Sequence, residues 1–515
     1  MRSHPHLCEV NARLWLGELR EQYGASLTLS AVPDEEWLRF KRLGVDSVWL
    51  MGVWATSPKA LAISRSSESL RKELDSVCPG CNEKDIGASP YAVYDYRLNP
   101  DLGQRFELAV LHENLKRLGL RLFLDFVSNH LAMDHPSIGT FTERFIHAGP
   151  EDVKAHPDWF FETDGNKGKV WLAYGRDPNF PPWTDTVQLN YFHPRLREQM
   201  IQTLLQIAPV CDGVRCDMAM LLLNDVYESI WGPLLRRQGF SKPYSEFWRD
   251  AVRTVKDRYP QFVFLAEAYW DLEWRLQELG FDYTYDKVLY DRLRYKTAEE
   301  VRGHLSADAL YQERSARFTE NHDETPAVTA FGKKKSLAAS VAAMTVKGMR
   351  FFHLGQLLGN PLRVPVQFLR CMTQEDEEVK RFYKKLLEIT NHPAFHEGEW
   401  AILEAHPCGN IVPQGPAARN DSSSASPGRP GDETFRNLLC WRWRLGRTEK
   451  LVAVNYADCV SCGTLEMDGV SGEGSWVVLE EFSGHFLDFS KERIRKEGFP
   501  IALSPYEARI FQLEF

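Results

Sequence analysis

Short apolar segments alternate with longer amphipathic segments from the N-terminus to about residue 400. The apolar segments have the length of buried strands, and the longer ones repeat apolar residues at helical spacing. The predicted strands are 13–16, 46–51, 121–125, 213–217, 262–267 and 349–353. The predicted helices are 34–43, 108–118, 195–207, 246–258 and 337–344. Such alternation is typical of a parallel sheet covered by helices.

Two stretches break this alternation. Residues 131–190 have weak periodicity and many Pro, Gly, Asp and aromatic residues, which indicates a subdomain inserted after the third predicted strand. Residues 412–434 are rich in Pro, Ser, Gly and Asn, which predicts a flexible loop. After this loop the apolar runs become strand-like again and have no helices between them, at 438–443, 451–455, 476–479 and 508–515. These runs predict a small antiparallel β domain.

The composition narrows the functional classes. The chain has 515 residues, 43% hydrophobic and 26% charged, which is ordinary globular composition and favours two or three domains. Its net charge of −9 argues against a nucleic-acid partner, which needs a concentrated basic surface. No signal peptide and no apolar stretch of about 20 residues is evident, so we expect a cytoplasmic protein without a membrane partner.

Ten cysteines are scattered along the chain. In a cytoplasmic protein we expect most of them to be reduced thiols. Two pairs, Cys78 with Cys81 and Cys459 with Cys462, have the spacing of zinc ligands, but they are too far apart in sequence for a compact zinc site. We therefore interpret them as incidental.

Carboxylates recur at the ends of the predicted strands. Asp125, Asp217 and Glu267 each end an apolar run, and Asp323 occupies a similar place after a more polar segment. A single acid in such a place is often a helix cap. In an eight-stranded α/β barrel, however, the C-terminal strand ends meet on one face, where active sites lie. Four such placements therefore predict an active site.

The motifs around these carboxylates resemble those of the α-amylase family. They are Asp-Phe-Val-Ser-Asn-His at 125–130, Gly-Val-Arg-Cys-Asp at 213–217, Ala-Glu-Ala at 266–268 and Phe-Thr-Glu-Asn-His-Asp at 318–323. Three further segments, at 89–100, 185–190 and 348–356, also resemble family segments. The motifs occur in the family's order, and the resemblance covers the whole barrel and, more loosely, the C-terminal domain.

This resemblance implies a fold. We expect a (β/α)₈ barrel formed by residues 1–130 and 191–400, with residues 131–190 as an inserted subdomain. Residues 401–515 are expected to form a C-terminal antiparallel β-sandwich.

The resemblance also implies roles for the three matching carboxylates. Asp217 matches the nucleophile of a retaining glycosidase, and Glu267 matches the general acid/base. Asp323 matches the third carboxylate, which binds sugar hydroxyls and stabilises the transition state.

Further residues match substrate-binding positions of the family. His130 and His322 match histidines that bind the sugar beside the scissile bond, and Tyr91 matches the aromatic platform under that sugar. Arg215 lies two residues before Asp217 and so shares its strand face, where its charge would keep Asp217 ionised. Asp125 is expected to organise the site near Arg215.

The sequence departs from the family pattern on the acceptor side. Many members carry Lys-His where this chain has Met220 and Leu221; that pair helps to bind acceptor sugars, and its His carbonyl ligates calcium. Asn129 still matches a calcium ligand of the family, so calcium is a candidate ion, although the reaction requires no cofactor. Ala88 replaces an Asp that grips the terminal sugar in exo-acting relatives.

The expected function is retaining hydrolysis of an α-1,4-glucan or maltodextrin through a glycosyl-aspartate intermediate. The same residues also support transglycosylation or sugar isomerisation of the trehalose synthase type, and products longer than the substrate would indicate transfer. A non-catalytic carbohydrate-binding barrel is a remote alternative, because such barrels lose the catalytic carboxylates retained here. The expected partner is an α-glucan or oligosaccharide, and the oligomeric state is left open.

Overall fold

Eight parallel strands form a closed barrel in the computed structural model, which describes residues 2–408 and 433–514. In chain order they are β1 (His6–Asn11), β2 (Ser47–Met51), β5 (Arg121–Val127), β11 (Gly213–Asp217), β12 (Val263–Ala266), β13 (Tyr283–Tyr285), β14 (Ser315–Arg317) and β15 (Met349–His353). The predicted (β/α)₈ fold is therefore confirmed.

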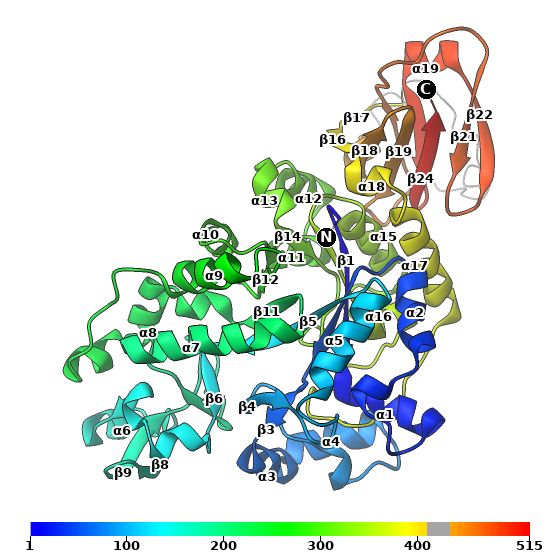
Figure 1. Ribbon diagram of the computed structural model, residues 1–515. Helices are drawn as coiled ribbons and strands as arrows, with labels where there is room; N and C mark the ends of the chain where they lie inside the picture. Colours follow the sequence, from blue (N-terminus) through cyan, green and yellow to red (C-terminus); the bar gives the residue numbers. More distant parts are fainter. Residues whose placement is uncertain (1, 409–432, 515) are drawn as a thin grey trace. The chain divides into compact units, whose positions relative to one another are not determined.

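Helices connect these strands (Figure 1). The five predicted helices are present as α2 (Asp34–Arg42), α5 (Glu107–Arg117), α7 (Pro194–Ile207), α9 (Phe247–Arg258) and α15 (Lys333–Met344). In α2 the first turn is acidic and the last turn is basic, which suits the helix dipole, and Trp37 and Phe40 are buried.

The first predicted strand, 13–16, is wrong. These residues lie in helix α1 (Ala12–Tyr23), and the first barrel strand is β1 instead. The side chain of Asn11 caps the helix by accepting the N–H groups of Arg13 and Leu14. The buried residues Trp15, Leu16 and Leu19 then follow at helical spacing. Over four residues such a run cannot be distinguished from a strand by periodicity.

The inserted subdomain after β5 contains two small antiparallel sheets. One pairs β6 (His130–Ala132) with β10 (Thr186–Gln188), so the two ends of the insertion are joined. The other contains β7 (His147–Ala148), β8 (Phe160–Gly165) and β9 (Gly168–Ala173).

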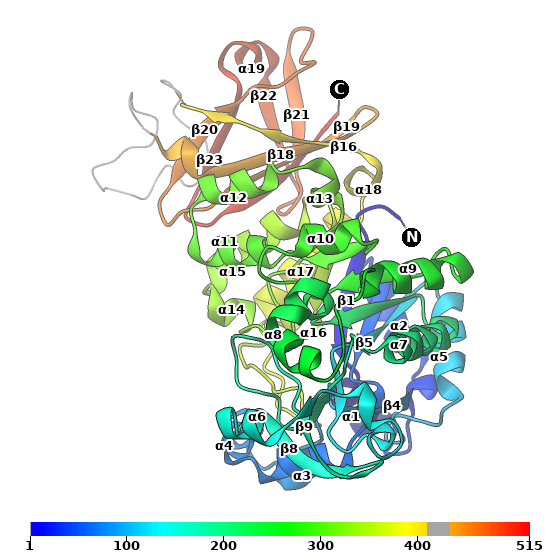
Figure 2. The ribbon, with the colours of Figure 1, turned by 90° about the vertical axis from the view of Figure 1, so that its left-hand side faces the viewer.

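The C-terminal part forms two antiparallel sheets around one apolar core, as predicted (Figure 2). The larger sheet has the order β16 (Glu399–Leu403), β18 (Leu438–Leu445), β19 (Thr448–Asn455), β24 (Ala508–Glu514), β21 (Ser475–Glu480), β22 (His485–Ser490). The smaller sheet has the order β17 (Ala405–His406), β20 (Ser461–Leu465), β23 (Phe499–Leu503). The loop predicted at 412–434 lies almost entirely outside the described residues, and Thr434 begins a short 3₁₀ helix (Thr434–Asn437).

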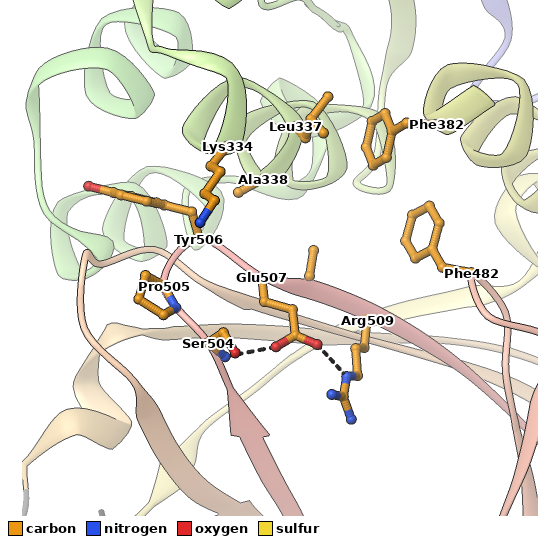
Figure 3. Close-up of a pocket in the computed structure, with 11 residues that line it drawn as sticks. Lys334, Leu337, Ala338, Phe382, Phe482, Ser504, Pro505, Tyr506, Glu507 and Arg509 are labelled. Atoms are coloured by element: carbon orange, nitrogen blue, oxygen red, sulfur yellow. Dashed lines mark hydrogen bonds and ion pairs between the residues drawn. The ribbon is translucent and has the colours of Figure 1, made fainter. Parts of the chain in front are cut away.

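The contacts divide the chain into two compact units. The first comprises Leu7–Tyr285 and Arg363–Thr373, and the second comprises Met1–His6, Asp286–Leu362 and Gln374–Phe515. The second unit has a hollow of about 630 Å³ bordered by α15 and by residues 504–509 (Figure 3). There Glu507 accepts hydrogen bonds from the Ser504 N–H (2.8 Å) and from Arg509 Nε (2.7 Å), so its charge is already paired within the hollow.

Cys78 and Cys81 form a disulfide, which corrects the expectation of free thiols for this pair. The turn between them is closed by a hydrogen bond from the Cys81 N–H to the Cys78 carbonyl (2.9 Å), and Gly80 has a φ of +90°. This turn brings the two Cα atoms to 5.5 Å, within disulfide range. The other eight cysteines, all in described segments, are free thiols. Within the described ranges, no helix combines the length and apolar character that a membrane crossing requires.

Candidate active site

The Arg215 guanidinium binds three of the predicted site carboxylates. Its Nη1 lies 2.7 Å from Asp217 Oδ1 and 3.6 Å from Asp125 Oδ1, and its Nη2 lies 2.9 Å from Glu267 Oε2. All four side chains are buried, with Asp217 the most accessible at 8%. The structure thus brings together four residues that the sequence predicted to lie close to one another, namely Asp125, Arg215, Asp217 and Glu267.

Strand register explains this cluster. Residue Arg215 of β11 is opposite Asp125 of β5 in the parallel ladder. Because side chains alternate along a strand, Arg215 and Asp217 lie on the same face. Glu267 directly follows β12, the neighbour of β11 on its other side. Three adjacent strands therefore deliver the cluster.

Two further groups hold the Glu267 carboxylate. The Met218 N–H donates to Glu267 Oε2 at 2.6 Å, and the Tyr269 hydroxyl donates to Oε1 at 2.8 Å. Met218 has a left-handed backbone with a φ of +44°, which is uncommon for a residue other than Gly. This conformation turns the chain after Asp217 so that its N–H reaches Glu267.

The Asp125 carboxylate and carbonyl are fixed by the segment after β2. The Gly52 N–H donates to Asp125 Oδ2 (3.2 Å), and the Trp54 indole N–H donates to the Asp125 carbonyl (2.7 Å). Asp125 is therefore anchored on one side and contacts Arg215 on the other, which suits an organising role.

The charges of the cluster support one another. Burial alone would lower the pKa of Arg215, but the nearby Glu267 carboxylate, with the other acidic groups, holds that pKa well above its ordinary value. Arg215 is therefore a permanent cation. Its guanidinium also lies over the rings of Trp49 (5.2 Å) and Tyr91 (5.3 Å).

His130 is buried close to this cluster. Burial lowers its pKa, and the charge of Asp217 opposes the shift only in part, so the ring is neutral at neutral pH. The ring lies 4.9 Å from that of Trp183 in the inserted subdomain. A neutral imidazole can donate one hydrogen bond to a sugar hydroxyl or accept one from it.

The two remaining predicted residues, His322 and Asp323, follow β14 in the second compact unit. They pair with each other, with His322 Nε2 at 3.1 Å from Asp323 Oδ2. The Asp323 side chain is 48% exposed, whereas that of His322 is buried. Asn321 Oδ1 accepts the N–H groups of Asp323 and Glu324 (both 3.0 Å) and so fixes this turn.

The surroundings of Asn129 do not suit a calcium ion. Nε2 of Gln188 donates to Asn129 Oδ1 (2.9 Å), the Asn129 carbonyl (2.9 Å) and the Leu189 carbonyl (3.3 Å). An amide nitrogen therefore holds the oxygens that a cation would bind, and calcium prefers several carboxylate or carbonyl oxygens. Among the described residues, no group of three or more His, Cys, Asp or Glu could hold a metal ion.

Several aromatic residues of the site were not predicted from the sequence. The Tyr285 hydroxyl accepts a hydrogen bond from Arg215 Nε (3.3 Å), and Trp49, Trp54, Trp183 and Tyr269 contact site residues as described above. Tyr269 and Tyr285 lie just after or at the end of barrel strands, and that placement is the signal that could have identified them.

Comparisons with known proteins agree with this geometry. A family model described as alpha amylase, catalytic domain, matches residues 38–400. Alpha-amylase MalA of Haloarcula japonica is 25% identical over 286 residues, which are 54% of this chain and 37% of that protein. The alpha-1,4-glucan:maltose-1-phosphate maltosyltransferase of Rhodospirillum rubrum is 27% identical over 193 residues, 36% of this chain and 22% of that protein.

The matched region thus spans well under half of each of these two relatives. Among solved structures, the noncanonic maltogenic alpha-amylase AmyB from Thermotoga neapolitana superimposes with a TM-score of 0.64. It is 20% identical, and the match covers 99% of both chains, which supports the fold. The family model covers more than half of this sequence, so the chain belongs to the α-amylase family of glycosidases and related transglycosylases.

Proposed function

We propose that this enzyme hydrolyses α-1,4-linked glucan or maltodextrin with retention of configuration. The observation that carries the proposal is the Arg215 cluster, in which Asp217 and Glu267 bind different nitrogens of one guanidinium. That arrangement favours the short carboxylate separation, about 5 Å, of retaining enzymes over the wider spacing that admits a water molecule.

In the first step, Asp217 attacks the anomeric carbon and forms a glycosyl ester. Glu267 donates its proton to the departing glycosidic oxygen, so the leaving sugar departs as a neutral alcohol. With Glu267 protonated, the two carboxylates of Asp125 and Asp217 still outnumber the single Arg215 cation, and this excess of negative charge favours the positive charge that develops on the sugar ring.

In the second step, ionised Glu267 removes a proton from water, which attacks the anomeric carbon and releases Asp217. In this proposal Tyr91 lies under the donor sugar, while His130, His322 and Asp323 bind its hydroxyls. Asp125 and Arg215 act through Asp217 and Glu267 by holding and orienting them.

A second candidate is transfer to a sugar hydroxyl in place of water. On the acceptor side the polar pair common in the family is replaced by Met220 and Leu221, which are at most 1% exposed, so an acceptor sugar would have to be held by other residues. One of the relatives, moreover, is a maltosyltransferase. Products longer than the maltooligosaccharide supplied would support transfer.

The test combines a variant with the stereochemistry of the first product. The Asp217→Asn variant is expected to lose at least about 10⁴-fold in kcat. Proton NMR of the wild-type reaction is expected to show the α-anomer first, and mass spectrometry with a slow fluorinated glucosyl donor should show a sugar ester on Asp217. A β-anomer as first product, or an Asp217→Asn variant as active as wild type, would refute the proposal.

A further inference from the structure

A loop of the inserted subdomain closes beside His130. It runs over residues 176–182, and its two ends are joined because the Trp183 N–H donates to the Gly175 carbonyl (2.8 Å). Thr186 secures both ends, since its Oγ1 accepts the Gly175 N–H (3.1 Å) and donates to the Trp183 carbonyl (2.7 Å). Thr186 belongs to β10, which pairs with the strand that begins at His130. Gly175 and Trp183 are therefore tied to the backbone that carries His130.

No free space remains between Gly175 and His130. A Cβ atom at Gly175 would lie 2.9 Å from Cβ and 3.0 Å from Cγ of His130, whereas ordinary van der Waals contact begins at 3.4 Å. It would also lie 2.6 Å from Thr186 Oγ1. The φ of Gly175 is not in the left-handed region, so the close approach of His130, and not the backbone conformation, accounts for glycine here.

The imidazole of His130 is confined as well. Its centroid lies 4.9 Å from that of the Trp183 ring, and the two planes are inclined by 48°. Asn129 Nδ2 lies 3.5 Å from Nδ1 of the imidazole, which is also hydrogen-bonded to the backbone of Tyr91. Only 3% of His130 is exposed. The base of the side chain thus rests on Gly175, and its ring is held by Trp183 and two polar contacts.

The loop itself is fixed within the inserted subdomain. The Arg176 guanidinium lies 3.7 Å over the ring of Trp159. Asp177 Oδ1 accepts the N–H groups of Asn179 (2.6 Å) and Phe180 (3.0 Å), while the Phe180 side chain at the tip is 67% exposed. Local contacts therefore order the loop, and its two ends carry that order to His130.

We propose that Gly175 and Trp183 are positioning residues that hold the His130 imidazole in the orientation that binds the donor sugar. This inference rests on the proposed function of His130. Neither residue needs to touch the substrate, because both act through contact with His130. Such support matters because displacing a site group by about 1 Å can cost about 100-fold in rate. The inserted subdomain would thus control the catalytic site through one side chain.

The experiment is a double-mutant cycle in the full-length enzyme, measured as kcat/KM on maltopentaose. Trp183→Ala removes the ring that faces His130, and we expect kcat/KM to fall about 10-fold or more. In a His130→Ala background the same change should alter kcat/KM by less than about twofold, because the group that Trp183 positions is gone. Trp183→Phe keeps an aromatic ring against His130 and should retain most of the activity.

A glycine pair tests the steric contact. Gly175→Ala should also lower kcat/KM about 10-fold or more, because its Cβ would displace His130. Gly139→Ala is the matched control, since an added Cβ at this glycine of the same subdomain meets nothing within 4 Å. Phe180→Ala removes the exposed ring at the tip of the loop. Both controls should match wild type, and all assays are run well below the Tm of the least stable variant.

The possible results have distinct meanings. Wild-type activity of Trp183→Ala and Gly175→Ala would overturn the inference. A Trp183→Ala loss that is equally large in the His130→Ala background would also overturn it, because Trp183 would then act independently of His130. If Trp183→Ala does not fold, Trp183→Leu replaces it in the same cycle and is judged in the same way. A wild-type enzyme inactive on maltopentaose, or a fully active His130→Ala variant, would instead refute the proposed function.

Discussion

Replacing Gln188 by Glu is expected to make the stability of this enzyme depend on calcium. The Gln188 side chain is completely buried, and its Nε2 donates to three oxygens, two from Asn129 and one from Leu189. A carboxylate at the same position would place a fourth oxygen against these three. A hard cation could then bind all four.

The expected loss in the free energy of unfolding follows from the contacts of Gln188. The change removes two hydrogen bonds of 2.9 Å, each with a net value of about 1 kcal/mol, and leaves buried oxygens facing an unpaired charge. We expect a total loss of about 3–5 kcal/mol in the free energy of unfolding without calcium. Calcium at 100 times its Kd for the Gln188→Glu variant would raise the free energy of unfolding again by about 2.7 kcal/mol.

The assay is urea unfolding in excess chelator and in excess calcium chloride. Wild type should give the same midpoint in both, because an amide already occupies the position of the cation. Gln188→Met, the uncharged control, should be destabilised equally in both, and Gln188→Glu should recover only in calcium. A wild-type urea midpoint that falls in chelator, or a Gln188→Glu variant whose midpoint is the same with and without calcium, would refute the reasoning.

Two other predictions concern stability. Gly213→Ala should lower the free energy of unfolding by about 1–3 kcal/mol in urea titrations, because its Cβ would meet the Val263 carbonyl at 2.7 Å and the ring of Phe123 at 2.8 Å; an unchanged midpoint would contradict this packing. Stability should also decrease as the pH falls below about 6.5, because burial lowers the pKa of His396 to about 3 and that of His135 to about 4. In that range the unfolded chain takes up protons that the folded chain does not, at about 1.4 kcal/mol per pH unit for each histidine, so His396→Asn should flatten the pH dependence of the urea midpoint.

The barrel and the Arg215 cluster could be predicted from the sequence for a physical reason. Runs such as 121–125 and 262–267 are mostly apolar and end in a carboxylate, so local pattern and chemistry indicate the same strand end. The predicted strand 13–16 was wrong because a run of four residues with three apolar ones fits a helix equally well once Asn11 caps it. The catalytic roles, the domain boundaries and the cytoplasmic location stay predictions.

Contacts between residues that are far apart in sequence could not be predicted in this way. Gln188 and Asn129 are 59 positions apart and meet only because β10 pairs with β6. Tyr285 was missed because β13 has only three residues, too few to show a period. The Cys78–Cys81 disulfide depends on turn geometry, which the spacing of the two residues leaves open.

The register of β5 and β11 has a consequence for folding fidelity. Arg215 meets Asp125 because these two residues are partners in the ladder. A slip of β11 by one residue would turn Arg215 and Asp217 to the opposite face and leave Asp125 and Glu267 buried without their cation. Misaligned barrels are therefore penalised at the strand that carries Arg215 and Asp217. The charges proposed to act in catalysis thus also favour the correct strand register while the chain folds.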